Sequence, residues 1–289
     1  MHEAHPIDTL LRCPLCAGAL TLTQRGASCA QGHQFDRARQ GYFNLLPAHQ
    51  RASKSPGDDR EMVRARRLVL SRGHYAPLSE RINARCVELF KDQKTPPLLL
   101  DVGCGEGYYS AALLRELQEL GLDPALLGLD ISKAAVRAAA GRARDQRWIV
   151  ASGARMPLRD GGIDLSLCLF SPLSSGEFWR VLRPGAHLLV ASTGAAHLRS
   201  LRALIYEELK ERSFDPAPPL SRDFELLWEE QVSFPISLQS AEEVSALLAM
   251  TPHQWRASAA ARARIAACAS LETSAEVSLW LFQRRSRVI

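Results

Sequence analysis

The sequence lacks a long apolar run, a secretion signal and a strong excess of charge of one sign. No apolar run approaches the ~20 residues that span a bilayer, and the N-terminal MHEAHPIDTL has no basic-then-apolar signal pattern. We therefore expect a cytoplasmic protein with no membrane partner. The net charge of +5, from 36 Lys+Arg against 31 Asp+Glu, is too small to identify a nucleic-acid partner by itself.

Apolar residues are plentiful, and their pattern changes along the chain. With 289 residues, 46% of them hydrophobic, the protein can bury a full-sized core. From residue 97 onward, short apolar segments alternate with helical patterns, which predicts an α/β fold with a mostly parallel sheet covered on both faces. The predicted strands of that sheet are Leu98–Val102, Leu126–Leu129, Trp148–Ala151, Ile163–Phe170 and His187–Ala191.

Helices are predicted on both sides of this alternating region. Two precede it, from Asp58 or Asp59 to about Ser71 and over Pro77–Phe90, and a long one is expected over Ala196–Arg212. Two later strand segments, Phe224–Leu238 and Glu276–Gln283, flank a helical insert at residues 241–269 whose role the sequence does not indicate.

Three of the seven cysteines lie within the first 30 residues and form a metal-ligand pattern. Cys13 and Cys16 make a CxxC pair, and Cys29 and His33 follow as C-x3-H. Four such donors suit tetrahedral Zn²⁺, and a complete ligand set indicates a structural rather than a catalytic metal. The alternatives are a free CxxC beside an unrelated Cys and His, or a redox pair, although no βαβ pattern surrounds this CxxC. The other cysteines have apolar neighbours and are expected to be buried.

A glycine-rich loop follows the first predicted strand directly. It reads Asp101-Val-Gly103-Cys-Gly105-Glu106-Gly107, and Asp130 ends the second strand 23 residues later. Glycines let the backbone approach a ligand closely, and a carboxylate at that strand end can bind both ribose hydroxyls. A dinucleotide site is the alternative, but the spacing is GxGxG rather than GxGxxG.

Together these motifs resemble a known enzyme class. DVGCGEG, Asp130 and ASGARMPL resemble the S-adenosylmethionine site of class I methyltransferases, over about residues 97–195. The CPLC…C…H motif with QGYFNLL, SPGDDREMVRARR and RGHYAPL is similar to the rRNA large-subunit guanine-N1 methyltransferase family, over nearly the whole chain.

The resemblance implies three segments: a zinc-binding RNA-recognition domain (1–46), a linker with helices bordering the cofactor site (47–96), and a Rossmann-like methyltransferase domain (97–289). It also implies structural Zn²⁺, a homodimer, and methyl transfer from S-adenosyl-L-methionine to N1 of one guanine in a 23S rRNA hairpin. The cofactor contacts that it implies are Tyr75, Asp101, Gly103, Gly105, Glu106, Asp130, Ala154 and His197. Tyr75 could instead be a packing residue, and His197 a surface residue.

Methyl transfer to guanine N1 also requires removal of the N1 proton, because N1 is protonated at neutral pH. Asp58, Asp59 and Glu106 are candidate bases, and none is assigned. Phe170-Ser171-Pro172-Leu173 stands where related enzymes often have Asn or Asp before Pro-Pro-Tyr, which argues against methylation of an exocyclic amine.

Basic charge is concentrated near the N-terminus. Residues 1–80 hold 11 Lys+Arg against 7 Asp+Glu, and residues 51–72 hold seven against three, including Arg60, Arg64 and Arg67 on one expected helix face. This stripe favours an RNA substrate, and the alternative is a solvated amphipathic helix packed on the catalytic domain. Two alternatives remain: a methyltransferase acting on tRNA or a small molecule, and a catalytically silent RNA-binding ribosome-assembly factor. The intact glycine loop and Asp130 argue against the silent protein.

Overall fold

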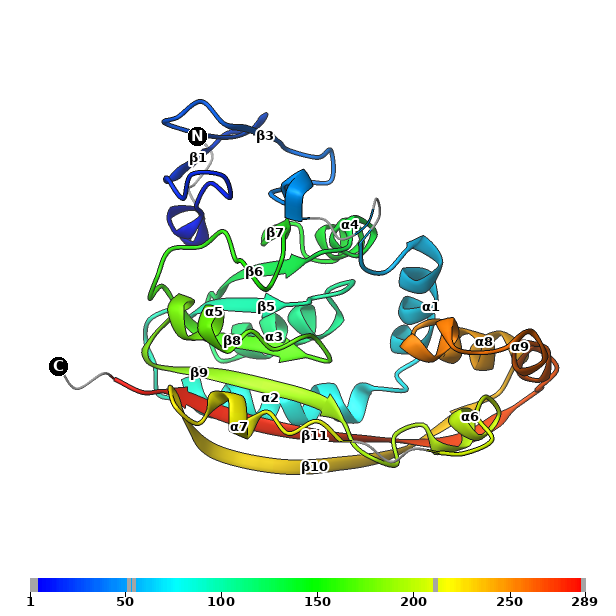
Figure 1. Ribbon diagram of the computed structural model, residues 1–289. Coiled ribbons are helices and arrows are strands. Elements are labelled where there is room, and N and C mark those ends of the chain that lie inside the picture. The colour runs from blue at the N-terminus through cyan, green and yellow to red at the C-terminus, as the bar shows by residue number, and fades with distance from the viewer. Residues whose placement is uncertain (1–4, 51–52, 54–55, 210–212, 287–289) are drawn as a thin grey trace.

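The computed structural model describes residues 5–50, 53, 56–209 and 213–286, which form a small N-terminal sheet and a large central sheet (Figure 1). The small sheet has the order β1-β2-β3, and the large one β10-β11-β9-β8-β5-β6-β7-β4. The strands are β1 Leu20–Leu22, β2 Gly26–Cys29, β3 Gln34–Asp36, β4 Phe43–Asn44, β5 Leu98–Val102, β6 Ala125–Asp130, β7 Arg147–Val150, β8 Ile163–Leu169, β9 Leu182–Thr193, β10 Phe224–Leu238 and β11 Leu271–Arg284.

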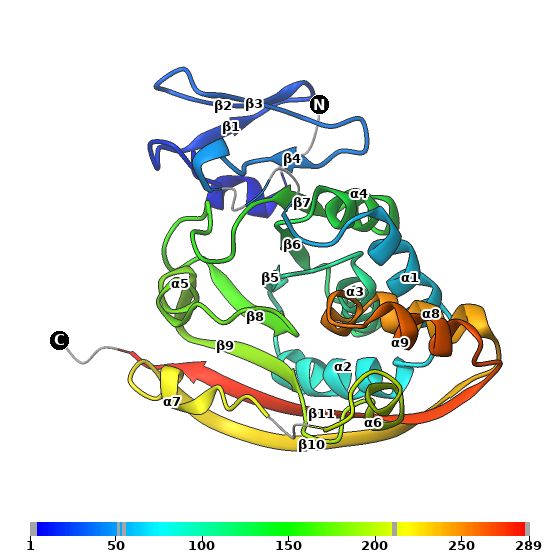
Figure 2. The same ribbon diagram turned by 45° about the vertical axis from the view of Figure 1, so that its right-hand side comes forward.

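The large sheet is parallel from β4 across to β9, and β11 and β10 add an antiparallel hairpin beyond β9. The predicted α/β fold with a mostly parallel sheet is therefore confirmed. Strands β5 and β10 have the predicted bounds, and the bounds of the other predicted strands differ by up to five residues. In both views the hairpin β10–β11 curves along the whole lower side of the molecule (Figures 1 and 2).

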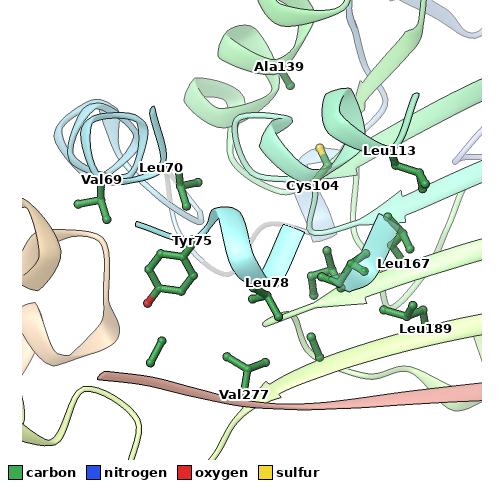
Figure 3. Packing of buried hydrophobic residues seen from close by; sticks show 14 of the residues in the cluster. Val69, Leu70, Tyr75, Leu78, Cys104, Leu113, Ala139, Leu167, Leu189 and Val277 are labelled. Atoms are coloured by element: carbon green, nitrogen blue, oxygen red, sulfur yellow. The ribbon is translucent and has the colours of Figure 1, made fainter. Parts of the chain in front are cut away.

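Helices cover one face of the large sheet. Leu99 and Leu126 point to this face, where they join a core cluster with the helices, and Figure 3 shows Leu78, Leu113 and Leu167 in the same cluster. Counting both faces of the sheet, the helices of the described residues are η1 Pro6–Leu10, η2 Ala48–Gln50, α1 Arg60–Ser71, α2 Ala76–Phe90, α3 Tyr108–Glu119, α4 Lys133–Arg142, α5 Ser175–Val181, α6 Arg199–Ala203, α7 Ala217–Leu220, α8 Ala241–Ala249, η3 Pro252–Trp255 and α9 Ala259–Ala266. The insert at residues 241–269 is helical, as predicted.

The opposite face is covered by α5 and by the N-terminal segment. Leu100, which alternates with Leu99 along β5, belongs to a second cluster that also contains Leu11 and Phe43. β4 pairs with β7 in the large sheet, and Arg147 on β7 makes an ion pair with Asp8, with Nε 2.6 Å from Oδ1. The N-terminal segment therefore shares its core with the large sheet.

The predicted long helix over Ala196–Arg212 is wrong for residues that the structure describes. Only α6 is helical there: Leu198 before it has a left-handed backbone (φ 52°), and turns follow Ala203. Leu204 is the C-cap of α6, and its carbonyl oxygen accepts a hydrogen bond from the Arg264 guanidinium of α9, which satisfies a group left free at the helix end. Residues 210–212 of the prediction lie outside the described residues.

Four cysteines lie outside the metal-ligand pattern, and three of them are buried, as the sequence predicted. Cys86, Cys104 and Cys168 are buried, whereas Cys268 is half-buried, with its thiol 3.0 Å from the Ser270 carbonyl oxygen. No helix among the described residues is long and apolar enough to cross a membrane.

Candidate active site and metal centre

A cavity of about 460 Å³ opens at the carboxyl ends of the parallel strands, where α/β sheets usually bind ligands. The loops after β5, β6, β7 and β8 line it, and α1 and the insert close it from the side. All the cofactor contacts expected from the sequence lie on its wall: Tyr75, Asp101, Gly103, Gly105, Glu106, Asp130, Ala154 and His197.

The glycine loop after β5 brings the backbone to the edge of the cavity. Gly103 (φ 79°) and Gly105 (φ 54°) have left-handed conformations, and a Cβ at Gly103 would lie only 2.4 Å from the Ser171 hydroxyl oxygen. Asp130 fixes the loop: its carboxylate accepts hydrogen bonds from the backbone N–H of Gly105 (2.9 Å) and of Ser132 (2.7 Å). Gly103 thus lets the loop pack directly against Ser171, and the left-handed backbone at both glycines shapes the turn that lines the cavity.

Asp101 is a buried carboxyl group with one unpaired oxygen on the cavity wall. Its Oδ2 accepts a hydrogen bond from the Ser110 hydroxyl, whereas Oδ1 has no partner among the described residues. Burial raises the pKa of Asp101 to about 7; the Ser110 hydrogen bond opposes this shift and the nearby Asp130 charge adds to it. An unpaired buried oxygen of this kind fits an ammonium group, such as that of a bound amino acid.

Glu106 is held by Arg142 of α4. Both Nε and Nη2 of Arg142 reach Oε2, while Oε1 is buried without a partner in the described chain. Burial raises the pKa of Glu106 and the Arg142 guanidinium lowers it. One oxygen of Glu106 is therefore committed to the fold and the other is available to a ligand.

Tyr75 and His197 meet at the same cavity from distant parts of the chain. The Tyr75 hydroxyl lies 3.4 Å from Nε2 of His197, and Nδ1 of that ring lies 2.9 Å from the carbonyl oxygen of Glu276 on β11. Burial lowers the pKa of His197 to about 4, so the ring is neutral at pH 7. His197 is therefore buried, not on the surface, while Tyr75 lines the cavity and also packs edge-on against Phe234.

Arg66 is a cavity residue that the sequence interpretation overlooked. It forms an ion pair with Asp58, and its Nη2 donates to the Met250 carbonyl oxygen at 3.1 Å. Its position four residues before the buried Leu70, on the inward face of α1, was the available signal. Arg66 joins the loop before α1 to the insert, whose residues 250–252 line the cavity.

The three candidate bases do not all reach the cavity. Asp59 is the N-cap of α1, accepting from two backbone N–H groups, and is absent from the cavity wall. Asp58 lines the cavity near Asp130, and the Ser132 hydroxyl donates to its backbone carbonyl. Asp58 and Glu106 therefore lie on the side of the cavity that the glycine loop and β6 form.

The predicted zinc ligands are assembled on two turns of the small sheet. The ligand atoms of Cys13, Cys16, Cys29 and His33 all lie within 4.8 Å of one another. Sγ of Cys16 is 3.6 Å from Sγ of Cys29, and Nδ1 of His33 is 3.5 Å from Sγ of Cys13. A tetrahedron with 2.3 Å metal–sulfur bonds has edges of about 3.8 Å, so this set fits Zn²⁺.

Comparisons with known proteins agree with both sites. Residues 11–54 match a zinc-ribbon family model described as RlmA, N-terminal, and residues 99–187 match one described as Methyltransferase domain. A Streptomyces fradiae protein named 23S rRNA (guanine(748)-N(1))-methyltransferase is 36% identical over 85% of this chain and 85% of its own. A Micromonospora griseorubida protein, provisionally named for the same guanine-N1 activity on 23S rRNA, is 34% identical over 89% and 91%.

Proposed function

The chain belongs to the family of 23S rRNA (guanine-N1)-methyltransferases, and we propose on that basis that it transfers a methyl group from S-adenosyl-L-methionine to N1 of a guanine in a hairpin of 23S rRNA. The observation that supports this activity most directly is that all the expected cofactor contacts line one cavity. The same membership supports a homodimer, and an rRNA substrate would place the protein in the cytoplasm.

The bound cofactor would supply an electrophilic methyl group, and the residues of the cavity would hold and orient it. Asp101 suits the ammonium group, Asp130 the ribose hydroxyls, and the backbone near Ala154 the adenine. Tyr75, Glu106 and His197 complete the proposed contacts. Because methyl transfer is an in-line displacement, the main task of the protein is to fix the acceptor nitrogen behind the methyl group. S-Adenosylhomocysteine would leave as the N1–methyl bond forms, and the proton of guanine N1 would be released to solvent.

The acceptor guanine must leave its stack to enter the cavity, since the reacting atom is not accessible inside a helix. Single-stranded loops meet this requirement at the lowest cost, and their bases are also where proteins read RNA sequence. A hairpin loop is therefore the form of RNA that suits this site.

Incubation with labelled S-adenosylmethionine and unmodified rRNA, followed by nucleoside analysis, tests the proposed function. We expect label in N1-methylguanosine from 23S rRNA. Label confined to tRNA or to a small molecule would contradict the proposed substrate, and cofactor binding without transfer to any acceptor would point to a silent RNA-binding protein.

RNA binding should depend on the exposed arginines of α1. Arg60, Arg64 and Arg67 are all exposed, as the sequence predicted, whereas residues 51–52 and 54–55 of the basic stripe lie outside the described residues. We expect replacement of Arg64 and Arg67 by Gln to reduce the slope of log affinity against log salt by about 1.5, since each neutralised phosphate contributes ~0.7–0.9. Fluorescence anisotropy with a labelled rRNA hairpin measures this slope. The same change at exposed Arg115 and Arg222 is the control, and equal slopes for both variants would contradict the role of α1.

A further inference from the structure

Phe170, at the end of β8, is an aromatic residue in a backbone conformation that such residues rarely adopt. Its φ is 56°, in the left-handed region, where a bulky side chain is strained. Such strain persists only where the surrounding structure enforces it, and it occurs often at ligand-binding sites. The position therefore calls for an explanation beyond the turn itself, because glycine would make the same turn without strain.

The neighbouring contacts hold this turn rigidly. The Phe170 N–H donates to the Ala191 carbonyl oxygen of β9 at 2.9 Å, and the Cys168 thiol lies 3.5 Å from the Ser171 carbonyl oxygen. The Ser171 side chain packs directly over Gly103, so the turn is locked to the glycine loop. Phe170 is consequently fixed relative to the proposed cofactor contacts.

The ring of Phe170 is not packed into the core. The residue is 42% exposed, yet it lines the cavity. The apolar side chain of Phe170 is therefore exposed to the cavity, although its backbone conformation is strained.

Phe170 lies on the loop after β8, a part of the cavity wall that contains none of the proposed cofactor contacts. Asp101 and Asp130 lie near the carboxyl ends of β5 and β6, and Ala154 follows β7, the next strand in the sheet. His197 follows β9, on the far side of β8. The loop after β8, on the other side of β5, contributes Phe170, Ser171 and Pro172 to the wall and holds none of the eight expected contacts. This loop is therefore available to contact the methyl acceptor.

We propose that Phe170 is the stacking platform for the target guanine, holding the base flat beside the glycine loop so that N1 faces the methyl group. This inference rests on the proposed function and specifies how its acceptor is held. Aromatic side chains stack on bases with ~1–3 kcal/mol per base, which corresponds to about 5–150-fold in binding. No covalent role is assigned to Phe170.

Steady-state kinetics with purified full-length variants tests the platform. We expect Phe170→Ala to raise KM for RNA by about 10–100-fold, with the Kd for S-adenosylhomocysteine changed less than about twofold by calorimetry. Phe170→Tyr and Phe170→Trp should retain KM within about threefold, because both keep an aromatic face, whereas Phe170→Leu should resemble the Ala variant. Phe214→Ala removes a similarly exposed phenylalanine outside the cavity wall and is the matched control.

Phe170→Gly separates binding from folding. It relieves the strain, so its Tm should equal or exceed that of the wild type while its KM for RNA stays high. A parallel loss of S-adenosylhomocysteine affinity in Phe170→Ala would assign the ring to the cofactor and overturn the proposal. Wild-type kinetics in the Ala, Leu and Gly variants would also overturn it.

The kinetics use whichever RNA the wild type labels. Transfer to tRNA alone would contradict the 23S rRNA substrate but leave the Phe170 comparison valid. Transfer to no RNA at all would overturn both the proposed function and the platform.

Discussion

Replacement of Asp101 by Asn is expected to weaken binding of S-adenosylmethionine by about 100-fold or more and to abolish methyl transfer. Loss of one partner from a buried charge pair costs ~2–5 kcal/mol, and the unpaired Oδ1 of Asp101 is the buried oxygen proposed to face the cofactor ammonium group. Calorimetry with S-adenosylhomocysteine, which keeps that ammonium group, measures the change. Asp123→Asn, at an exposed site outside the cavity wall, is the control and should bind normally.

The same substitution should have the opposite effect on stability without cofactor. The pKa of Asp101 is raised to about 7 in the fold, against ~3.9 in the unfolded chain, so protonated Asp101 favours folding and ionised Asp101 opposes it. This contribution to the free energy of unfolding is full below pH 4 and is lost as the pH rises to about 7.

Above pH 7 the Asn variant should therefore melt at a higher temperature than the wild type. Cofactor affinity of the wild type should rise as the pH increases through about 7, and that dependence should disappear in the variant. A pH-independent wild-type affinity, or unchanged binding by Asp101→Asn, would contradict the role given to this carboxylate.

Replacement of Cys16 by Ala is expected to lower zinc affinity by more than about 100-fold, because even loss of a group that only supports a ligand costs 10–100-fold. RNA affinity should fall at least about tenfold, which requires a loss of only ~1.4 kcal/mol. Affinity for S-adenosylhomocysteine should stay nearly unchanged, since none of the zinc ligands lies on the cavity wall. Elemental analysis, anisotropy and calorimetry on one preparation measure the three effects.

Cys268→Ala is the matched control for this experiment, because its half-buried thiol lies outside the ligand set. The Cys16 variant should also melt at a lower temperature, as zinc binding contributes directly to folding and the ribbon shares a core with the large sheet. An equal loss of cofactor affinity would show that the two sites are not separable, and retention of stoichiometric zinc would contradict the ligand assignment.

Local patterns in the sequence predicted much of the fold and the site. Strand β5, the glycine loop after it and Asp130 follow from apolar runs and glycine spacing that act within one βαβ unit. The zinc ligands were equally predictable from the sequence, because Cys13 and Cys16 must share one turn and Cys29 and His33 another.

Features that depend on contacts between distant segments were not readable. The spacing to Leu70 indicates that Arg66 lies on the inward face of α1, but its place in the cavity depends on the packing of α1 against α8. The end of α6 at Leu204 is likewise capped by Arg264, which lies 60 residues downstream. The left-handed Phe170 has no local signal, since neither glycine nor asparagine marks the turn.

The two-residue strand β4 has a consequence for aggregation. It pairs with β7 through Phe43 and Asn44 and so covers what would otherwise be the apolar edge of the large sheet. Uncovered edge strands readily pair with other chains, and β7 carries Trp148 and Ile149. The N-terminal zinc-binding segment therefore protects the β7 edge of the large sheet from pairing with other chains. We expect a methyltransferase domain that lacks this segment to associate through that edge.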